Sequence, residues 1–167
     1  MDNLIAAGKI KPFIIVMTYG MTNDVKMGGL RNFDIKPFQT VLVDELIPYV
    51  DKTFRTIAKP EKRAMAGLSM GGMETKTITM NRPEVFSHYG LLSGGTYAPA
   101  DIKDKTKVKL VFLSCGSKER PDGIKNASAA LKEAGFNVVP YICEGTAHEF
   151  QTWRRSSYQM APLLFKD

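Results

Sequence analysis

Short apolar runs alternate along this chain with stretches that have helical spacing. The runs that predict strands are residues 13–17, 63–66, 89–93, 109–115 and 138–143. Helices are expected over residues 1–10, 38–54, 73–81 and 124–134, and the second should break or shift at Pro48. No repeat, low-complexity tract or linker divides the chain, so a single domain is expected over residues 1–167.

The hexapeptide Gly-Leu-Ser-Met-Gly-Gly, residues 67–72, stands where an expected strand meets an expected helix. In that context Gly-x-Ser-x-Gly predicts a nucleophile elbow, a turn that needs small residues two positions before and two after the serine. The turn exposes the Ser69 hydroxyl and aims the first N–H groups of the helix at the same point, so Met70 is a candidate oxyanion donor. The alternative is a chance match in a glycine-rich turn. The irregular segment 21–37 is expected to overhang this serine.

An elbow serine needs a base to remove its proton, and the chain has two histidines. His88 immediately precedes the strand 89–93 and enters the sheet at the end away from the serine, so we expect a surface or packed residue. His148 lies in the loop 144–150, after a late strand, which is where a catalytic histidine belongs. Its alternative is a polar residue beside a helix.

The acid that orients the base should follow the strand 109–115. Two carboxylates lie in that turn, Glu119 and Asp122. Asp122 belongs to a Pro-Asp-Gly turn and could cap the helix 124–134. Glu119 has no structural role of that kind, so it is the first candidate for the acid and Asp122 is the second.

The motifs GLSMGG and GTAHEFQTWR are the most specific parts of a family resemblance that covers nearly the whole chain. Residues 14–20, 38–54, 64–95, 111–120 and 145–158 resemble the feruloyl and acetyl esterases of carbohydrate esterase family 1, and the esterase D group is similar at a greater distance. The resemblance implies a three-layer α/β-hydrolase fold with a mostly parallel sheet. It implies a serine esterase for plant cell-wall carbohydrate esters or small aryl esters, with no metal and no organic cofactor.

Carried over residue by residue, the resemblance implies Ser69 as nucleophile, His148 as base and Glu119 as acid. Glutamate is a departure, because the family usually has aspartate at this place. It can do the same work with one extra methylene of reach.

Compared with the family, the chain is expected to begin after several strands and after the loop that gives the second oxyanion N–H. That donor is then expected from the turn 18–20, where Gly20 allows close approach of the backbone, or it is absent. Tyr19 and Trp153 are candidate substrate contacts, although packing in the core is the alternative for Trp153.

In the family sheet a further strand lies between those expected at residues 13–17 and 63–66. Either residues 13–17 move over to pair with residues 63–66, or another chain fills the gap. An unprotected strand edge is a template for pairing, so a homo-oligomer is expected. The alternative is that a loop such as residues 21–37 covers the edge.

The charge of the chain and its distribution argue against a nucleic-acid partner. The chain has 23 Lys and Arg against 17 Asp and Glu, a net charge of +6, but the basic residues are dispersed and no nucleic-acid module accompanies them. We expect no nucleic-acid partner and a small-molecule or carbohydrate ester as substrate.

No apolar stretch approaches the ~20 residues of a membrane span, and the N-terminus lacks a signal peptide, so a soluble chain of unassigned compartment is expected. Cys115 and Cys143 could approach one another, but free buried thiols are expected.

Two functions from different classes follow from these features. The first is a carboxylic ester hydrolase that uses the serine, histidine and glutamate named above. The second is a non-catalytic or weakly active remnant that keeps these residues and acts as an interaction module.

Overall fold

The computed structural model describes residues 1–22 and 34–166. The chain divides into two compact units, one made of Met1–Pro12 with Lys59–Asp167 and the other of Phe13–Ala58. Most of the irregular segment 21–37 lies outside the described residues.

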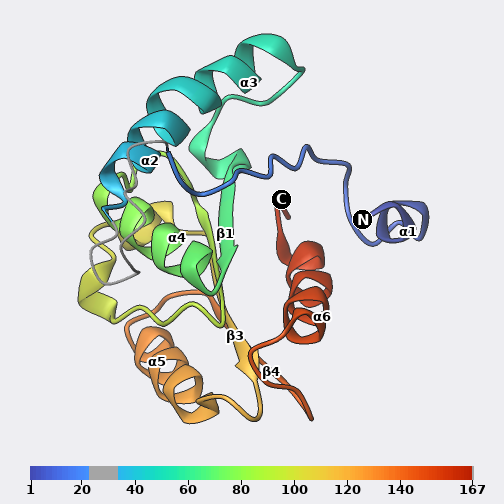
Figure 1. The fold of residues 1–167 in the computed structure, drawn as a ribbon, viewed down its shortest axis with the longest axis vertical. Coiled ribbons are helices and arrows are strands. Elements are labelled where there is room, and N and C mark those ends of the chain that lie inside the picture. Colours follow the sequence, from blue (N-terminus) through green and yellow to red (C-terminus); the bar gives the residue numbers. More distant parts are fainter. Residues whose placement is uncertain (23–33, 167) are drawn as a thin grey trace. The chain divides into compact units, whose positions relative to one another are not determined.

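The larger unit is built on a four-stranded parallel sheet (Figure 1). Its strands are β1 (Ala64–Leu68), β2 (His88–Leu92), β3 (Leu110–Gly116) and β4 (Val138–Cys143). They lie side by side in chain order, so the carboxyl ends of all four strands meet at one edge of the sheet. Every residue of β2 and β3 is buried, which is typical of parallel strands covered on both faces. Four of the five expected strands are confirmed, with small shifts at their ends.

The strand expected at residues 13–17 is wrong, because this segment has no regular secondary structure. A strand is defined by the neighbour that satisfies its backbone groups. β1 pairs with β2, and no second strand pairs with it in the described part of the chain. Whether the other side of β1 pairs with a second copy of the chain stays a prediction.

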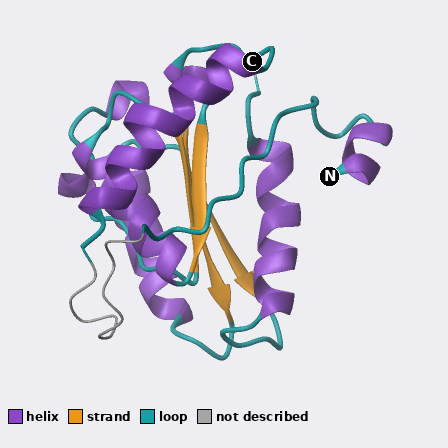
Figure 2. Cartoon of the chain, turned by 45° about the horizontal axis from the view of Figure 1, so that its top comes forward, coloured by secondary structure: helices purple, strands orange, loops and turns teal. Residues whose placement is uncertain are grey.

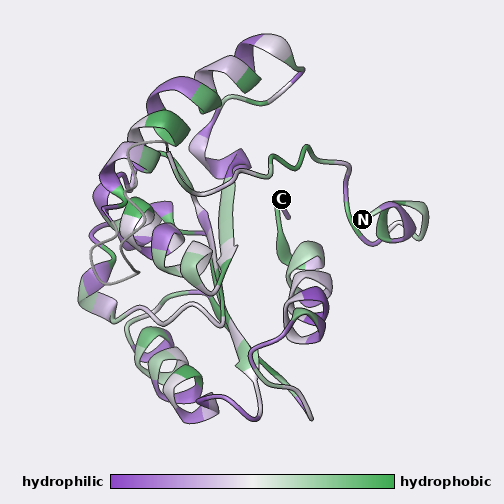
Figure 3. Cartoon of the chain, in the orientation of Figure 1, coloured by the Kyte–Doolittle hydropathy of each residue, from purple (hydrophilic) through white to green (hydrophobic). Residues whose placement is uncertain are grey.

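Three helices enclose the sheet in a three-layer arrangement. α4 (Met70–Asn81) and α5 (Pro121–Glu133) cover one face, and α6 (Phe150–Met160) covers the other (Figures 1 and 2). Hydrophobic and hydrophilic residues are interspersed along α5, as Figure 3 shows. In α5 the buried residues Ile124, Ser128 and Leu131 are spaced four and three apart, which places them on the face toward the sheet. Short 3-10 turns occupy Pro60–Lys62, Pro99–Asp101, Lys105–Lys107 and Ala161–Leu163.

α5 begins three residues earlier than the sequence indicated, at Pro121. Proline suits the first helical position, because the N–H that it lacks would have no partner there. Asp122 consequently lies inside the first turn, and no side chain caps the helix. The capping role expected for Asp122 is therefore wrong.

The smaller unit contains the helix expected over residues 38–54. It consists of α2 (Lys36–Thr40), a π-helical stretch (Val41–Leu46) and α3 (Ile47–Thr53), which follow one another without a break. The expected shift is this π-helical stretch, which comes just before Pro48, a residue that donates no backbone hydrogen bond. At the N-terminus, residues 1–10 form only the short helix α1 (Asp2–Ala6). None of the described helices is long and apolar enough to cross a membrane.

The two cysteines are free and buried, as expected. Cys115 is in register with Ile142, and Cys143 is in register with Gly116. Because successive residues of a strand point to opposite faces, the two thiols lie on opposite faces of the sheet. The expectation that they could approach one another is wrong.

Candidate active site

The turn between β1 and α4 has the geometry of the predicted elbow. Ser69 has φ 51° and ψ −114°, a conformation that L-residues rarely adopt and that costs on the order of 1–3 kcal/mol. Its N–H donates to the carbonyl oxygen of Leu92 at 2.9 Å, which ties the turn to the end of β2. α4 begins at the next residue, so no loop separates the strand from the helix.

Two glycines make this turn feasible. A Cβ at Gly67 would collide with the carbonyl oxygen of Gly71, and a Cβ at Gly72 would lie 2.5 Å from the Cα of Gly94. Gly71 itself has room for a side chain, since a Cβ there would come no closer than 4.0 Å to its nearest neighbour. The small residue required after the serine is therefore Gly72, one position later than the pattern indicated.

His148 lies against the serine. Its Nε2 is 2.8 Å from the Oγ of Ser69, and its Nδ1 is 2.8 Å from Oε2 of Glu119. The loop that carries it is fixed from both sides: the Thr146 hydroxyl donates to the Cys143 carbonyl oxygen at 2.9 Å, and the Thr152 hydroxyl donates to Thr146 at 2.6 Å. The imidazole stays about half exposed, so a substrate can reach it.

Glu119 occupies the turn after β3. Its Oε1 accepts hydrogen bonds from the Gly116 N–H at 2.7 Å and from the Ser93 hydroxyl at 2.8 Å. Burial alone would raise the pKa of Glu119, but these two bonds and the one with His148 outweigh it and lower the pKa below its usual value. An ionised carboxylate only accepts, so the proton of the imidazole resides on Nδ1 and Nε2 is free to accept from the Ser69 hydroxyl.

Asp122, the second candidate for the acid, is not brought to the histidine. Its side chain is 85% exposed, and it lies 3.4 Å from the ammonium of Lys125. The structure thus groups Ser69, His148 and Glu119 and leaves Asp122 at the surface.

Ser93 is a site residue that sequence reasoning missed. It follows β2 with φ 50°, its hydroxyl donates to Glu119, and it accepts a hydrogen bond from Nε1 of Trp153 at 3.2 Å. The Trp153 ring also meets His148 edge to face, with 5.1 Å between centroids. A signal was available, because Ser93 directly follows β2, the strand that lies between β1, which precedes Ser69, and β3, which precedes Glu119. The ring of Trp153 packs against the core beside Leu92, which favours the packing alternative, and its contact with substrate stays a prediction.

The first turn of α4 provides N–H groups beside Ser69. Intrahelical bonding to the Ser69 carbonyl begins with the N–H of Gly72 at 3.0 Å, so the N–H of Met70 precedes the bonded part of the helix. Gly20 has φ 77° and belongs with Tyr19 to the smaller unit. Their contributions to the site stay predictions.

One turn along α4, Glu74 is a buried acid. Its side chain is 4% exposed, and its Oε1 is without a hydrogen-bond partner in the described structure. Burial raises the pKa of this carboxyl to about 7.

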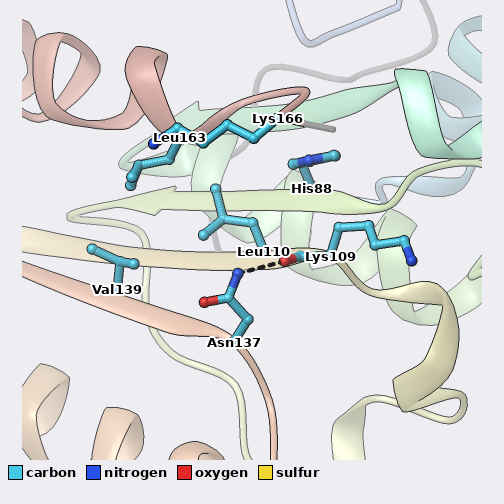
Figure 4. Close-up of a pocket in the computed structure, with 7 residues that line it drawn as sticks. All are labelled: His88, Lys109, Leu110, Asn137, Val139, Leu163 and Lys166. Carbon is cyan, nitrogen blue, oxygen red and sulfur yellow. Dashed lines mark hydrogen bonds between the residues drawn. The ribbon is translucent and has the colours of Figure 1, made fainter.

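A pocket of about 480 Å³ lies elsewhere, at the amino ends of β2, β3 and β4 (Figure 4). Its lining residues are His88, Lys109, Leu110, Asn137, Val139, Leu163 and Lys166. His88 is packed, as expected, with its Nδ1 2.8 Å from the Ser87 hydroxyl. This pocket lies at the opposite end of the strands from Ser69 and does not contribute to the site. Within the described ranges, no group of three or more His, Cys, Asp or Glu side chains is arranged to hold a metal ion.

Sequence relatives support an esterase. Residues 1–162 match the family described as "Putative esterase". The chain is 60% identical over 166 residues to the endo-1,4-beta-xylanase/feruloyl esterase of Xylanibacter ruminicola, a match that covers 99% of this chain and 23% of that protein. It is 26% identical over 113 residues to the uncharacterized protein YbbA of Bacillus subtilis, covering 57% of this chain and 44% of that protein. The chain therefore spans less than half the length of these curated relatives.

Solved structures share the fold. A ferulic acid esterase matches with a TM-score of 0.75 at 24% identity, over 97% of this chain and 74% of that one. A CE1 ferulic acid esterase from Anaeromyces mucronatus, in complex with ferulic acid, matches with a TM-score of 0.78 at 16% identity, over 98% of this chain and 69% of that one. The expected α/β-hydrolase fold class is confirmed by these matches and by the parallel sheet with helices on both faces. By the match over residues 1–162, the chain belongs to the esterase family.

Proposed function

We propose that this protein is a serine esterase that hydrolyses feruloyl or acetyl esters of plant cell-wall carbohydrates. The observation that carries the proposal is the unbroken hydrogen-bond path from the Ser69 hydroxyl through His148 to Glu119, with 2.8 Å at each step. These three residues follow three different strands, β1, β3 and β4. Their convergence has the geometry that nucleophilic acyl transfer needs.

The chemistry follows from the direction of these hydrogen bonds. Nε2 of His148 takes the proton of the Ser69 hydroxyl as Oγ attacks the acyl carbon of the ester. The imidazolium then gives that proton to the leaving alcohol as the acyl–oxygen bond breaks, which leaves an acyl-enzyme. Water repeats the cycle: His148 takes its proton, the hydroxide attacks the acyl carbon, and Ser69 recovers its hydroxyl as the acid leaves.

Glu119 serves the reaction through its charge and its position. Its lowered pKa keeps the carboxylate ionised, so it stabilises the imidazolium that forms in each half of the cycle. It also holds the proton on Nδ1 before attack, which leaves Nε2 free to accept from the serine.

The oxyanion of the tetrahedral intermediate is held by the N–H of Met70, at the start of α4. The positive end of the helix dipole adds to this stabilisation. A second N–H donor would add to this stabilisation. Loss of one such donor costs roughly a hundred- to a thousandfold in rate, so an enzyme with Met70 alone is slow and still measurable.

The names of the relatives support the substrate class. One is called a xylanase/feruloyl esterase, and a solved structure contains ferulic acid. The positive net charge favours acidic polysaccharides near the surface of the protein.

The test compares wild type with Ser69→Ala on methyl ferulate and on p-nitrophenyl acetate, together with labelling by a fluorophosphonate. Wild type should turn over both esters and become labelled, and Ser69→Ala should do neither while keeping its melting temperature. Ser128→Ala, a buried serine on α5, serves as the matched control and should behave as wild type. Labelling of Ser69→Ala at the wild-type rate would refute the assignment. A folded wild type that neither labels nor hydrolyses would instead support the non-catalytic interaction module.

A further inference from the structure

The two oxygens of the Glu119 carboxylate have separate partners. Oε2 faces Nδ1 of His148 at 2.8 Å, whereas Oε1 accepts from the Gly116 N–H at 2.7 Å and the Ser93 hydroxyl at 2.8 Å. The bonds to Oε1 therefore set the rotation of the carboxylate and determine which oxygen meets the histidine. We propose that Ser93 and Trp153 are positioning residues that hold Glu119 in the orientation that serves His148, an inference that rests on the proposed function.

The polarity of the hydrogen bonds fixes the Ser93 hydroxyl. An indole N–H can only donate, and an ionised carboxylate can only accept. Nε1 of Trp153 lies 3.2 Å from the Ser93 oxygen, so the serine accepts there and directs its own proton at Oε1 of Glu119. Trp153 thus acts through Ser93, and Ser93 acts through Glu119.

The backbone conformation of Ser93 would suit glycine better than serine, so the presence of serine points to a role for its hydroxyl. Ser93 has φ 50°, a left-handed conformation in which glycine would be free of strain. Its N–H donates to the Ser114 carbonyl oxygen at 2.7 Å, and the next residue, Gly94, touches Gly72 of the elbow helix. Ser93 therefore belongs to the turn that packs against the Ser69 elbow, and its hydroxyl connects that turn to Glu119.

The length of the acid explains why such an anchor is needed. Glutamate has one more rotatable bond than aspartate, so fixing its carboxylate costs more side-chain entropy. Without Ser93, the carboxylate would be held only by the Gly116 N–H and by His148, the group that it has to orient. The Ser93 hydroxyl adds a second anchor that does not depend on the histidine. Trp153 reinforces the arrangement from the other side, because its ring also contacts the His148 ring edge to face.

The test uses Ser93→Ala, Trp153→Phe and the double variant, with kcat and KM measured on p-nitrophenyl acetate. Ser93→Ala should lower kcat about tenfold, as the loss of one hydrogen bond does, and leave KM within about twofold. Trp153→Phe keeps a packed ring and should lower kcat by a smaller factor. If the tryptophan acts through the serine, the double variant should be no slower than Ser93→Ala alone. The matched control is Ser87→Ala, at the other end of β2, which removes a hydroxyl bonded to the Pro60 carbonyl and should leave kcat unchanged.

A second measurement does not depend on turnover. The ¹⁵N shifts of the His148 ring report which nitrogen carries the proton, and wild type should show the Nδ1–H tautomer. Ser93→Ala should shift part of the population to the Nε2–H tautomer, and Ser87→Ala should not. Wild-type kcat with an unchanged tautomer in Ser93→Ala, or additive losses in the double variant, would overturn the inference. If wild type itself hydrolyses nothing, the proposed function fails, and the tautomer still decides whether Ser93 positions the acid.

Discussion

The buried carboxyl of Glu74 gives the sharpest prediction about stability. The side chain is 4% exposed, and burial raises its pKa to about 7, from 4.5 in an unfolded chain. Below pH 4.5 the group is neutral in both states, so its burial costs little. As the pH rises from 4.5 to 7, the unfolded state loses its proton first, and the folded state loses stability relative to it. Glu74→Gln replaces the acid by a neutral group of the same shape and should remove this dependence.

The magnitude follows from the two pKa values. A shift of one unit corresponds to about 1.36 kcal/mol, so a rise from 4.5 to about 7 costs up to about 3 kcal/mol at pH 8. At pH 4 the cost is close to zero. For a chain of 167 residues, the same difference amounts to roughly 6–12 °C in melting temperature.

The assay is urea unfolding of wild type and Glu74→Gln at pH 4, 6 and 8. The advantage of the variant should grow by about 3 kcal/mol between the first pH and the last. Glu84→Gln is the matched control, since that carboxylate is bonded to Arg82 at 2.6 Å and its pKa is lowered. A free-energy difference between wild type and Glu74→Gln that does not change with pH would refute the claim that Glu74 is desolvated.

Three further predictions concern other residues. Glu119→Gln should lower kcat by roughly ten-thousandfold, because the amide stabilises the wrong tautomer of His148, whereas Asp122→Asn should leave kcat within about twofold. Equal losses for the two variants in steady-state assays would contradict this. Burial, together with nearby lysines, lowers the pKa of His88 to about 4. Wild type should therefore lose up to about 3 kcal/mol of stability as the pH falls from 6.5 to 4. In urea unfolding, the stability of His88→Asn should depend less on pH. Gly72→Ala should destabilise by about 1–3 kcal/mol through contact with the turn after β2, while Gly71→Ala, which has room, should not; thermal melts distinguish the two.

The parts of the site that sequence could predict are those fixed by strand order. Once Ser69, Glu119 and His148 were placed after separate parallel strands, the geometry of a sheet brought them to one edge. Position along the strand also excluded His88 as the base, because it lies at the opposite end of β2 from Ser69. These inferences needed only the direction of each strand and the position of each residue along it.

Features that depend on contacts between elements could not be predicted. Whether Gly71 or Gly72 had to be small depended on the approach of the turn after β2 to α4. The role of Ser93 depended on the rotation of the Glu119 carboxylate. The apolar run 13–17 had strand composition, but composition cannot supply the neighbour that makes a strand.

The order of strands in the sheet has a consequence for biosynthesis. Each strand lies beside the one that precedes it in the chain, so the sheet can grow by adding one strand and one helix at a time as the polypeptide emerges. Ser69 arrives with the first strand and Glu119 with the third, but His148 follows the fourth. A nascent chain that ends before β4 therefore carries Ser69 without its hydrogen-bond partner His148. The hydrogen-bonded group can first exist only when β4 and the loop that carries His148 have emerged from the ribosome.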